Sequence, residues 1–383
     1  MKLSIKLRIS LCIVLSMLVS LHLFNTVNAA TSYKISINEN EQISEVVLIK
    51  GTNYIPLKTA VRQLGYHVEW LQLNRTVNLF MPGRTIEIKT STGESKVNGK
   101  VYPGSPNDII VKNGITLITT KRLAQITGSS LKLQGKSINI SNGNQYVYGE
   151  SGSNSFWFST AGELYSMVKN STPQLIGKLD VTFNEQRYSK IQITPITTTG
   201  SFVIVVNTFS GEPLLINTSL KVFIKNNEIL QSAVFGDEEA LQTSKINGYW
   251  VFADSHSMKY VDDNGKAVQS YNFRDLIGND QYSIDGFAGD LVLVRSETKK
   301  VLWILDTHTK QSALLYKAIL SVDEQSSIEK NTDPADMHYG DNLHLISVKG
   351  SILTFSYFSY LQGAKDTEFT VEISKIKNYL SAQ

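Results

Sequence analysis

Cysteine is almost absent from the sequence. The 383 residues contain a single one, Cys12, and it lies inside an apolar run near the N-terminus. If that run is removed from the mature protein, no thiol remains. This excludes disulfides, cysteine-ligated zinc, iron–sulfur clusters and a cysteine nucleophile. Stability must then come from large hydrophobic cores rather than from covalent cross-links.

Proline and net charge are also low. The chain has 8 Pro and is 42% hydrophobic, a composition that excludes a disordered chain and a fibrous repeat. Its formal net charge is +3, and Lys2, Lys6 and Arg8 account for the whole excess. Because the rest of the chain is neutral overall, we expect no nucleic-acid partner, which would require a clustered basic face.

The N-terminus has the layout of a secretory signal peptide. A basic segment, residues 1–8, is followed by an apolar run at 11–24 and by small residues at Val27 and Ala29, as a signal-peptidase site requires. The run is shorter than the roughly 20 residues that span a bilayer, so we expect cleavage after Ala29. The alternative is an uncleaved N-terminal anchor. Without disulfides, the mature chain would suit the exterior of a Gram-positive bacterium, secreted or associated with the cell wall.

An internal repeat follows. Residues 51–70 and 114–133 align without a gap at an offset of 63 residues, so that Gly51 matches Gly114 and Gly65 matches Gly128. In the first copy the helix has apolar residues at i, i+3, i+4 and i+7, and Pro56 suits its first turn. Gly65 stands where a helix end needs positive φ. Each unit is therefore predicted to be two strands, one helix and a β-hairpin, with the apolar helix face formed by Leu57, Ala60, Val61 and Leu64.

These residues carry a family resemblance. Ile55-Pro56-Leu57-Lys58, Leu64-Gly65, Val68, Trp70 and Thr76-Val77-Asn78-Leu79 are similar to the pattern of the copper amine oxidase N-terminal-like (stalk) domain, which is common in secreted proteins of Paenibacillus-type bacteria. The resemblance covers residues 33–141, although the second copy has Thr119 and Leu133 in place of the proline and tryptophan. It implies an accessory α+β module that interacts with a surface or envelope, without copper chemistry. It also implies structural roles for Ile55, Pro56, Leu57, Gly65, Val68, Trp70 and Val77, with Trp70 in the core.

The remainder of the chain is predicted to be β. Residues 142–154 are rich in Gly, Ser and Asn and are interpreted as a linker that contains one short strand. From 155 to 383, strand patterns open at Ser155, Ser201, Gly248, Asp290 and Asn342. This spacing favours a five-bladed β-propeller, whose blades are four-stranded and of about that length. A β-sandwich, or two small β domains, is the alternative.

Motifs with a specific catalytic mechanism are not found in the sequence. His67 and Glu69 share one strand face and could hold a metal, although a solvated face is the simpler interpretation. Asp336, His338 and His344 offer hard oxygen and imidazole ligands, but their loop lacks calcium-loop spacing and is expected to be a polar connection. Residues 262–265 are expected to form a hairpin turn.

A glycan-active enzyme is the alternative to a binding protein. Five-bladed propellers can act as glycosidases through carboxylates near a central channel, and the candidates here are Asp254, Asp285, Asp290 and Asp306. Convergence of three of them would favour the enzyme. The tryptophans at strand period are expected to lie mainly in cores; they are Trp157, Trp250 and Trp303.

The sequence thus predicts a secreted, non-catalytic binding or scaffold protein of the bacterial cell envelope. The repeat module would serve for attachment and the β domain for recognition, with a cell-wall polymer or an envelope protein as partner. We expect no cofactor, no nucleic acid and no transmembrane span after cleavage of the signal.

Overall fold

The fold is taken from a computed structural model of the chain. It describes residues 34–383 except 39, 43–45, 144–145, 170, 182–188, 211–215, 237–244, 337–338, 360 and 362–364. The expected signal segment lies outside the described residues. None of the helices in the described part combines the length and the apolar character that crossing a membrane requires.

The two sequence repeats fold as two copies of one unit, as predicted. The first unit consists of β3 (Val47–Ile49), β4 (Thr52–Pro56), α2 (Leu57–Gln63), β5 (His67–Leu71) and β6 (Thr76–Met81). The second consists of β10 (Ile109–Lys112), β11 (Ile115–Thr119), α3 (Thr120–Thr127), β12 (Ser130–Gln134) and β13 (Ser137–Ser141). We call residues 34–142 the module.

The two units meet across a local two-fold axis. Strands β4 and β11 pair antiparallel in a sheet of order β10-β11-β4-β3. Ile55 lies opposite Ile118, its own equivalent at the offset of 63. Both side chains are buried in one core that also receives the apolar faces of α2 and α3. The repeat therefore buries its two hydrophobic faces against each other.

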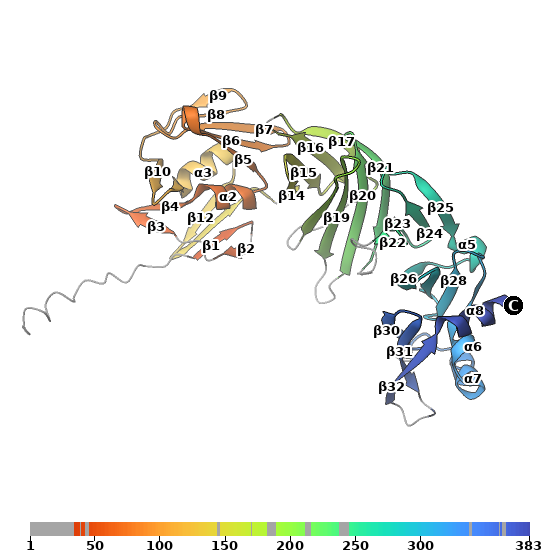
Figure 1. Ribbon diagram of the computed structural model, residues 1–383. Coiled ribbons are helices and arrows are strands. Elements are labelled where there is room, and N and C mark those ends of the chain that lie inside the picture. Colours follow the sequence, from red (N-terminus) through yellow and green to blue (C-terminus); the bar gives the residue numbers. More distant parts are fainter. Residues whose placement is uncertain are drawn as a thin grey trace, which may run out of the picture.

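Each hairpin is extended into a larger sheet. Strands β5 and β6, which the short 3-10 helix η1 (Gln72–Asn74) connects, form a five-stranded meander with β7 (Arg84–Lys89), β8 (Ser95–Val97) and β9 (Lys100–Tyr102). The hairpin β12–β13 is joined by β1 (Lys34–Ile37), which pairs with β13 in parallel, and by β2 (Asn40–Gln42). These sheets enclose the core from both sides (Figure 1).

Five antiparallel meander sheets follow, and we call them the sheet array. The first comprises β14 (Tyr146–Ser151), β15 (Asn154–Ser159), β16 (Glu163–Val168) and β17 (Gln174–Lys178). The second comprises β18 (Lys190–Ile196), β19 (Ser201–Ser210), β20 (Ile216–Lys225) and β21 (Glu228–Phe235). The third comprises β22 (Lys245–Ile246), β23 (Tyr249–Ala253), β24 (Ser257–Val261) and β25 (Ala267–Asn272).

The last two sheets carry short helices at their ends. The fourth comprises β26 (Tyr282–Ala288), β27 (Leu291–Ser296), β28 (Leu302–Asp306) and β29 (Ser312–Leu314), and the fifth β30 (Leu343–Lys349), β31 (Ile352–Ser359) and β32 (Lys365–Glu372). The all-β expectation for 155–383 omitted four helices of the described chain, all of which lie between sheets or after the last one. They are α5 (Phe273–Leu276), α6 (Leu315–Ile319), α7 (Val322–Lys330) and α8 (Ile373–Ser381).

Consecutive sheets of the array pack face to face. Phe158 of the first sheet shares a core with Val222 of the second, and Leu293 of the fourth shares one with Phe355 of the fifth. The sheets follow one another along an open arc (Figure 1). Within the described residues they do not close into a ring, so the expected five-bladed propeller is corrected to an open series of blade-like sheets.

The two ends of the array explain why the ring stays open. The outer face of the first sheet is already occupied, because Trp157 and Met167 belong to the core of the module. The outer face of the fifth sheet is polar where His344, Ser356 and Glu368 stand in register. A linear stack of sheets needs such capped ends, one covered and one soluble. The first sheet therefore has no free outer face, and the fifth sheet exposes this polar row, with Ile346 and Ile352 also exposed on β30 and β31.

The start of the array also differs from expectation. The short strand predicted within residues 142–154 is β14, and it pairs with β15 along its whole length. The openings expected at Ser201 and Gly248 fall on the second strands of their sheets, β19 and β23, or beside them. The first four sheets begin one strand earlier than expected, whereas the fifth begins with β30, directly after the opening expected at Asn342.

Candidate functional site

The residues of the family pattern mostly support the fold of the module. Ile55, Leu57 and Val77 are buried, Pro56 and Val68 are half-buried, and Gly65 has φ +85° as the end of α2 requires. Trp70 does not lie in the core as expected, since 44% of it is exposed. It stands near the end of β5, the edge strand of its sheet, and its equivalent Leu133 is 59% exposed.

The C-terminal end of α2 is the point where the module joins the array. Three backbone oxygens there have no partner within the helix. Gln63 O accepts from Asn38 Nδ2 at 3.2 Å, and Leu64 O accepts from Asn142 Nδ2 at 2.8 Å. Gly65 O accepts from Nε1 of Trp157, on β15, at 2.7 Å. A fully buried tryptophan of the array therefore completes a helix end of the module.

A polar cluster flanks this tryptophan, and we call it the junction cluster: Arg62, His67, Tyr148, Glu150 and Ser155. His67 Nδ1 lies 3.0 Å from the Tyr148 hydroxyl and 3.1 Å from Ser155 Oγ. The Tyr148 hydroxyl donates to Glu150 Oε2 at 2.7 Å, and Arg62 forms an ion pair with the other carboxylate oxygen. The cluster thus links α2 and β5 of the module to β14 and β15 of the array.

The electrostatics of the cluster favour a neutral imidazole. Burial lowers the pKa of His67, although the nearby Glu150 carboxylate opposes this. Burial alone would raise the pKa of Glu150, but the hydrogen bond from Tyr148 and the charge of Arg62 hold it below its ordinary value. His67 therefore serves as a hydrogen-bonding group between hydroxyls. His67 thus contacts hydroxyl groups and does not form the metal-binding pair with Glu69 that its strand spacing allowed.

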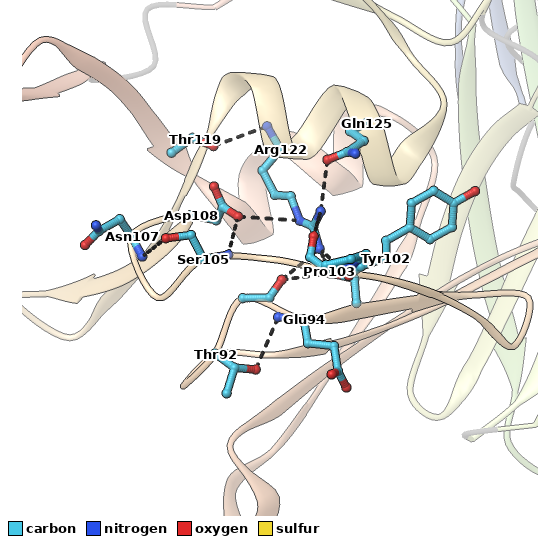
Figure 2. Close-up of polar contacts among 12 residues, drawn as sticks. Thr92, Glu94, Tyr102, Pro103, Ser105, Asn107, Asp108, Thr119, Arg122 and Gln125 are labelled. Atoms are coloured by element: carbon cyan, nitrogen blue, oxygen red, sulfur yellow. Dashed lines mark hydrogen bonds and ion pairs between the residues drawn. The ribbon is translucent and has the colours of Figure 1, made fainter.

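A second polar centre fixes the loops of the module on α3, and Figure 2 shows it. Arg122 is 3% exposed, and its guanidinium lies over the loop that joins β9 to β10. In that loop Gly104 approaches so closely that a Cβ would lie 1.9 Å from Gly93 O. The guanidinium donates hydrogen bonds of 2.8–3.1 Å to five acceptors: the backbone oxygens of Gly93, Tyr102 and Pro103, Ser95 Oγ and Gln125 Oε1.

The Arg122 contacts lead to a stability prediction. In Arg122→Met, three carbonyl groups lose a charged donor in a buried position, so we expect the free energy of unfolding to fall by about 3 kcal/mol. Urea unfolding of both proteins measures this. Lys121→Met is the matched control, because Lys121 is exposed on the same helix and should change stability by less than about 0.5 kcal/mol. Equal midpoints for the two variants would show that the loop is held by other contacts.

The four carboxylates of the enzyme alternative do not converge. Asp254 Oδ1 accepts the backbone N–H groups of His256 and Ser257, each at 2.8 Å. Asp306 Oδ1 accepts the corresponding groups of its own turn. Asp290 is exposed at a hairpin, 3.5 Å from the Lys377 ammonium group. Asp254 and Asp306 thus stabilise their own turns, as turn-forming aspartates do, whereas Asp290 pairs with a lysine of α8.

The fourth carboxylate belongs to a cross-link between the last two sheets. Asp285 receives Arg295 Nη2 at 2.6 Å, and Arg295 Nη1 also lies 3.3 Å from Asp341. Asp341 is fully buried and accepts the backbone N–H of Leu302 at 2.6 Å. Burial raises the pKa of Asp341, and Arg295 opposes this shift. Sequence reasoning missed this cross-link, because its members are up to 56 residues apart in sequence.

The weak metal candidates are not brought together. His344 is exposed on the outer face of β30, and Asp336 lies in an exposed turn with Asn331 Nδ2 3.4 Å from its carboxylate. His338 lies outside the described residues. In the part of the chain that the structure describes, no three His, Cys, Asp or Glu side chains are grouped as a metal site would need. Copper does not fit residues 34–142 either, since their one imidazole, His67, is engaged by hydroxyl groups.

The aromatic candidates are mostly core residues, as expected. Trp157 and Trp250 are 0% and 5% exposed, and Trp303 is half-buried between two cores. Trp250 Nε1 donates to Asp263 Oδ1 at 2.9 Å, within the hairpin turn predicted at 262–265. Gly265 in this turn has φ +82°, as such a turn needs.

Comparisons with known proteins identify the module. A family model of the copper amine oxidase N-terminal domain matches residues 36–142. No curated protein matches the chain. Similar solved structures include the WD40 β-propeller domain of Doa1, at 10% identity, covering 57% of this chain and 79% of that chain with a TM-score of 0.22. The computationally designed Ika8 protein is 12% identical, and the match covers 79% of this chain and 84% of that chain with a TM-score of 0.26. Apo AztD from Citrobacter koseri is 8% identical, and the match covers 65% of this chain and 84% of that chain with a TM-score of 0.19.

Proposed function

We propose that the protein is a secreted, non-catalytic scaffold of the bacterial cell envelope. The module attaches to the envelope, and the sheet array presents a recognition surface to a further partner. One observation carries the proposal: the module and the first sheet share a single hydrophobic core, centred on Trp157. Domains that only lie side by side on a flexible linker move independently, whereas a shared core gives the array a fixed direction from the attachment point.

The shape of the array supports the same role. An open row of sheets that pack only on their neighbours exposes a long continuous surface, as in repeat proteins that bind through such surfaces. A closed propeller would instead concentrate its ligands at a central channel. The local partners of Asp254, Asp290 and Asp306 also argue against a glycosidase site, which needs two carboxylates facing one bond.

Co-sedimentation with purified cell-wall sacculi tests this proposal. The mature chain, residues 30–383, should pellet with sacculi at low salt and in part at high salt. The complete mature chain is needed, because a cut at residue 141 would remove Trp157 from the core of the module. An unrelated protein of similar size is the control. If the chain stays in the supernatant at both salt concentrations, the envelope-attachment role is wrong.

A further inference from the structure

The overall neutrality of the mature chain conceals a separation of charge. Residues 34–142 contain 14 Lys+Arg and 7 Asp+Glu, a formal charge of +7. Residues 143–383 contain 20 Lys+Arg and 27 Asp+Glu, a formal charge of −7. The module is therefore strongly basic and the array is acidic by the same amount. Such asymmetry between the parts of a chain is typical of a basic part that meets a polyanion.

Four of the exposed basic residues of the module lie at equivalent or neighbouring positions of its two-fold repeat. Lys58 and Lys121 are equivalent at the offset of 63, each in the first turn of its helix. Lys50 lies in the turn of the β3–β4 hairpin, and Lys112 lies at the corresponding turn of β10–β11. All four side chains are exposed, and within the described residues none of them forms an ion pair. The repeat thus presents the same basic feature twice.

The register of the sheet gathers these lysines into two sites. Thr119 pairs with Tyr54, so the start of α3, with Lys121, lies at the end of the sheet that holds the turn of Lys50. By the same antiparallel pairing, the start of α2, with Lys58, lies at the end that holds the turn of Lys112. A five-residue strand separates the two ends, which is about 17 Å. We call these ends the paired lysine sites.

Three of the seven acids of the module are engaged elsewhere. Glu94 lies 2.7 Å from Lys89, Glu87 lies 3.7 Å from Lys96, and Asp108 lies 4.0 Å from buried Arg122. These pairs neutralise basic residues of the five-stranded meander and of α3. The potential at the paired lysine sites is therefore that of unpaired ammonium groups, which attract anions through water over about 8–10 Å.

The geometry of the two sites selects the shape of the partner. They lie at opposite ends of the sheet, so a partner that engages both must extend over about 17 Å. A flexible chain can contact both, and binding at one site raises the effective concentration at the other. The large apolar side chains exposed beside the lysines are aliphatic, namely Leu48, Val111 and Ile115. Proteins that bind single-stranded nucleic acids stack bases on aromatic side chains instead.

We propose that the paired lysine sites bind a linear phosphodiester polymer of the cell envelope. This inference rests on the proposed envelope role and names the chemical class of its partner. Each ammonium group pairs with a phosphate oxygen as a charged donor, while the aliphatic side chains cover the uncharged carbon backbone between phosphates. Binding releases counterions from the polymer, so the affinity falls steeply with salt.

Two measurements test the inference. The first is titration of the mature chain with long-chain inorganic polyphosphate and with tripolyphosphate, which is too short to span both sites. The test variant carries Lys50→Gln, Lys58→Gln, Lys112→Gln and Lys121→Gln, which should weaken binding of the long polymer at least 10-fold and lower the slope of log K against log salt. The matched control changes four exposed lysines of the array to Gln: Lys266, Lys299, Lys310 and Lys349. The control should bind as the unmodified chain does.

The second measurement is co-sedimentation with sacculi before and after mild acid removal of their phosphodiester-linked polymers. Loss of pelleting after acid, and in the four-lysine variant, supports the inference. Equal pelleting before and after acid leaves envelope attachment standing but overturns the phosphodiester partner. No pelleting with untreated sacculi overturns the envelope role itself. Tighter binding of single-stranded DNA than of polyphosphate at equal salt would assign the sites to nucleic acid and overturn the inference.

Discussion

Replacing Trp157 by alanine should lower the free energy of unfolding by about 4 kcal/mol. The side chain is fully buried between the module and the first sheet, with its ring 5.2 Å from that of Tyr148. Truncating a buried aromatic residue to alanine costs about 3–5 kcal/mol. The variant also leaves Gly65 O without its donor in a buried position, which adds to the loss. The damage falls on the one core that the module and the array share.

Two further variants separate packing from hydrogen bonding at this position. Trp157→Phe keeps most of the ring but removes the donor to Gly65 O, so we expect a smaller loss of about 1–3 kcal/mol. Trp70→Ala is the matched control, because it is the same change at a side chain of the module that is 44% exposed. Urea unfolding followed by circular dichroism gives the midpoints. If Trp157→Ala and Trp70→Ala unfold at the same urea concentration, the module and the array do not depend on this contact.

The fold of the module could be predicted further than that of the array. The signals in the repeat are local: apolar spacing at Leu57–Leu64 gives the helix, and Gly65 gives its end. The pairing of β4 with β11 was not predicted, because strands 63 residues apart carry no local signal for each other. Trp70 was misplaced for a related reason. The alternation of Trp70 with polar neighbours predicts on which face of the sheet its side chain lies. It does not show that Trp70 stands at the edge of the core.

In the array, sequence patterns gave the strands and the turns but not the arrangement of the sheets. A hairpin turn has the same sequence signal within a sheet and at its edge, so the sequence does not show that the first four sheets begin one strand before the expected openings. Closure of a ring depends on what covers the outer faces. The burial of Trp157 by the module and the polar row at His344 are properties of the assembled fold. Neither can be derived from the period of the strands.

The polar centres were the least predictable features. His67 meets Tyr148 and Ser155, which follow it by 81 and 88 residues. Arg122 stands on a short helix where an arginine usually faces water, and only the folded loops show that it is buried. The charge separation between module and array was present in the sequence. The net charge of residues 30–383 does not reveal it, because the charges of the two parts cancel.

Lys221 is the second position at which we expect a large effect. It lies on β20 and is 1% exposed. Its Nζ is 5.4 Å from the ring centroid of Phe252 and 5.9 Å from that of Trp250, both on β23. Burial lowers the pKa of Lys221 from 10.5 to about 7. The amine of Lys221 therefore binds its proton less tightly in the native protein than in the unfolded chain.

This difference in pKa sets the direction of the pH dependence. Between pH 7 and pH 10.5 the unfolded chain binds the proton of Lys221 and the native chain releases it. The contribution of Lys221 to stability therefore rises with pH, by about 1.4 kcal/mol per unit at most and by roughly 4 kcal/mol over the window. Below pH 7 both states are protonated, and the native state carries the full desolvation penalty.

Lys221→Met should therefore stabilise the protein by about 3 kcal/mol at pH 6 and remove this rise with pH. Methionine is similar in length and has no charge to desolvate, although it loses the attraction of an ammonium group to two aromatic rings. Lys225→Met, on the same strand, is the matched control, because Lys225 is only half-buried and binds Asn264 Oδ1 at 2.9 Å. Urea midpoints at pH 6, 7.5 and 9 measure both effects. A Lys221→Met protein that is less stable than the unmodified chain at pH 6 would mean that the charge contributes more to the packing of the second and third sheets than its burial costs.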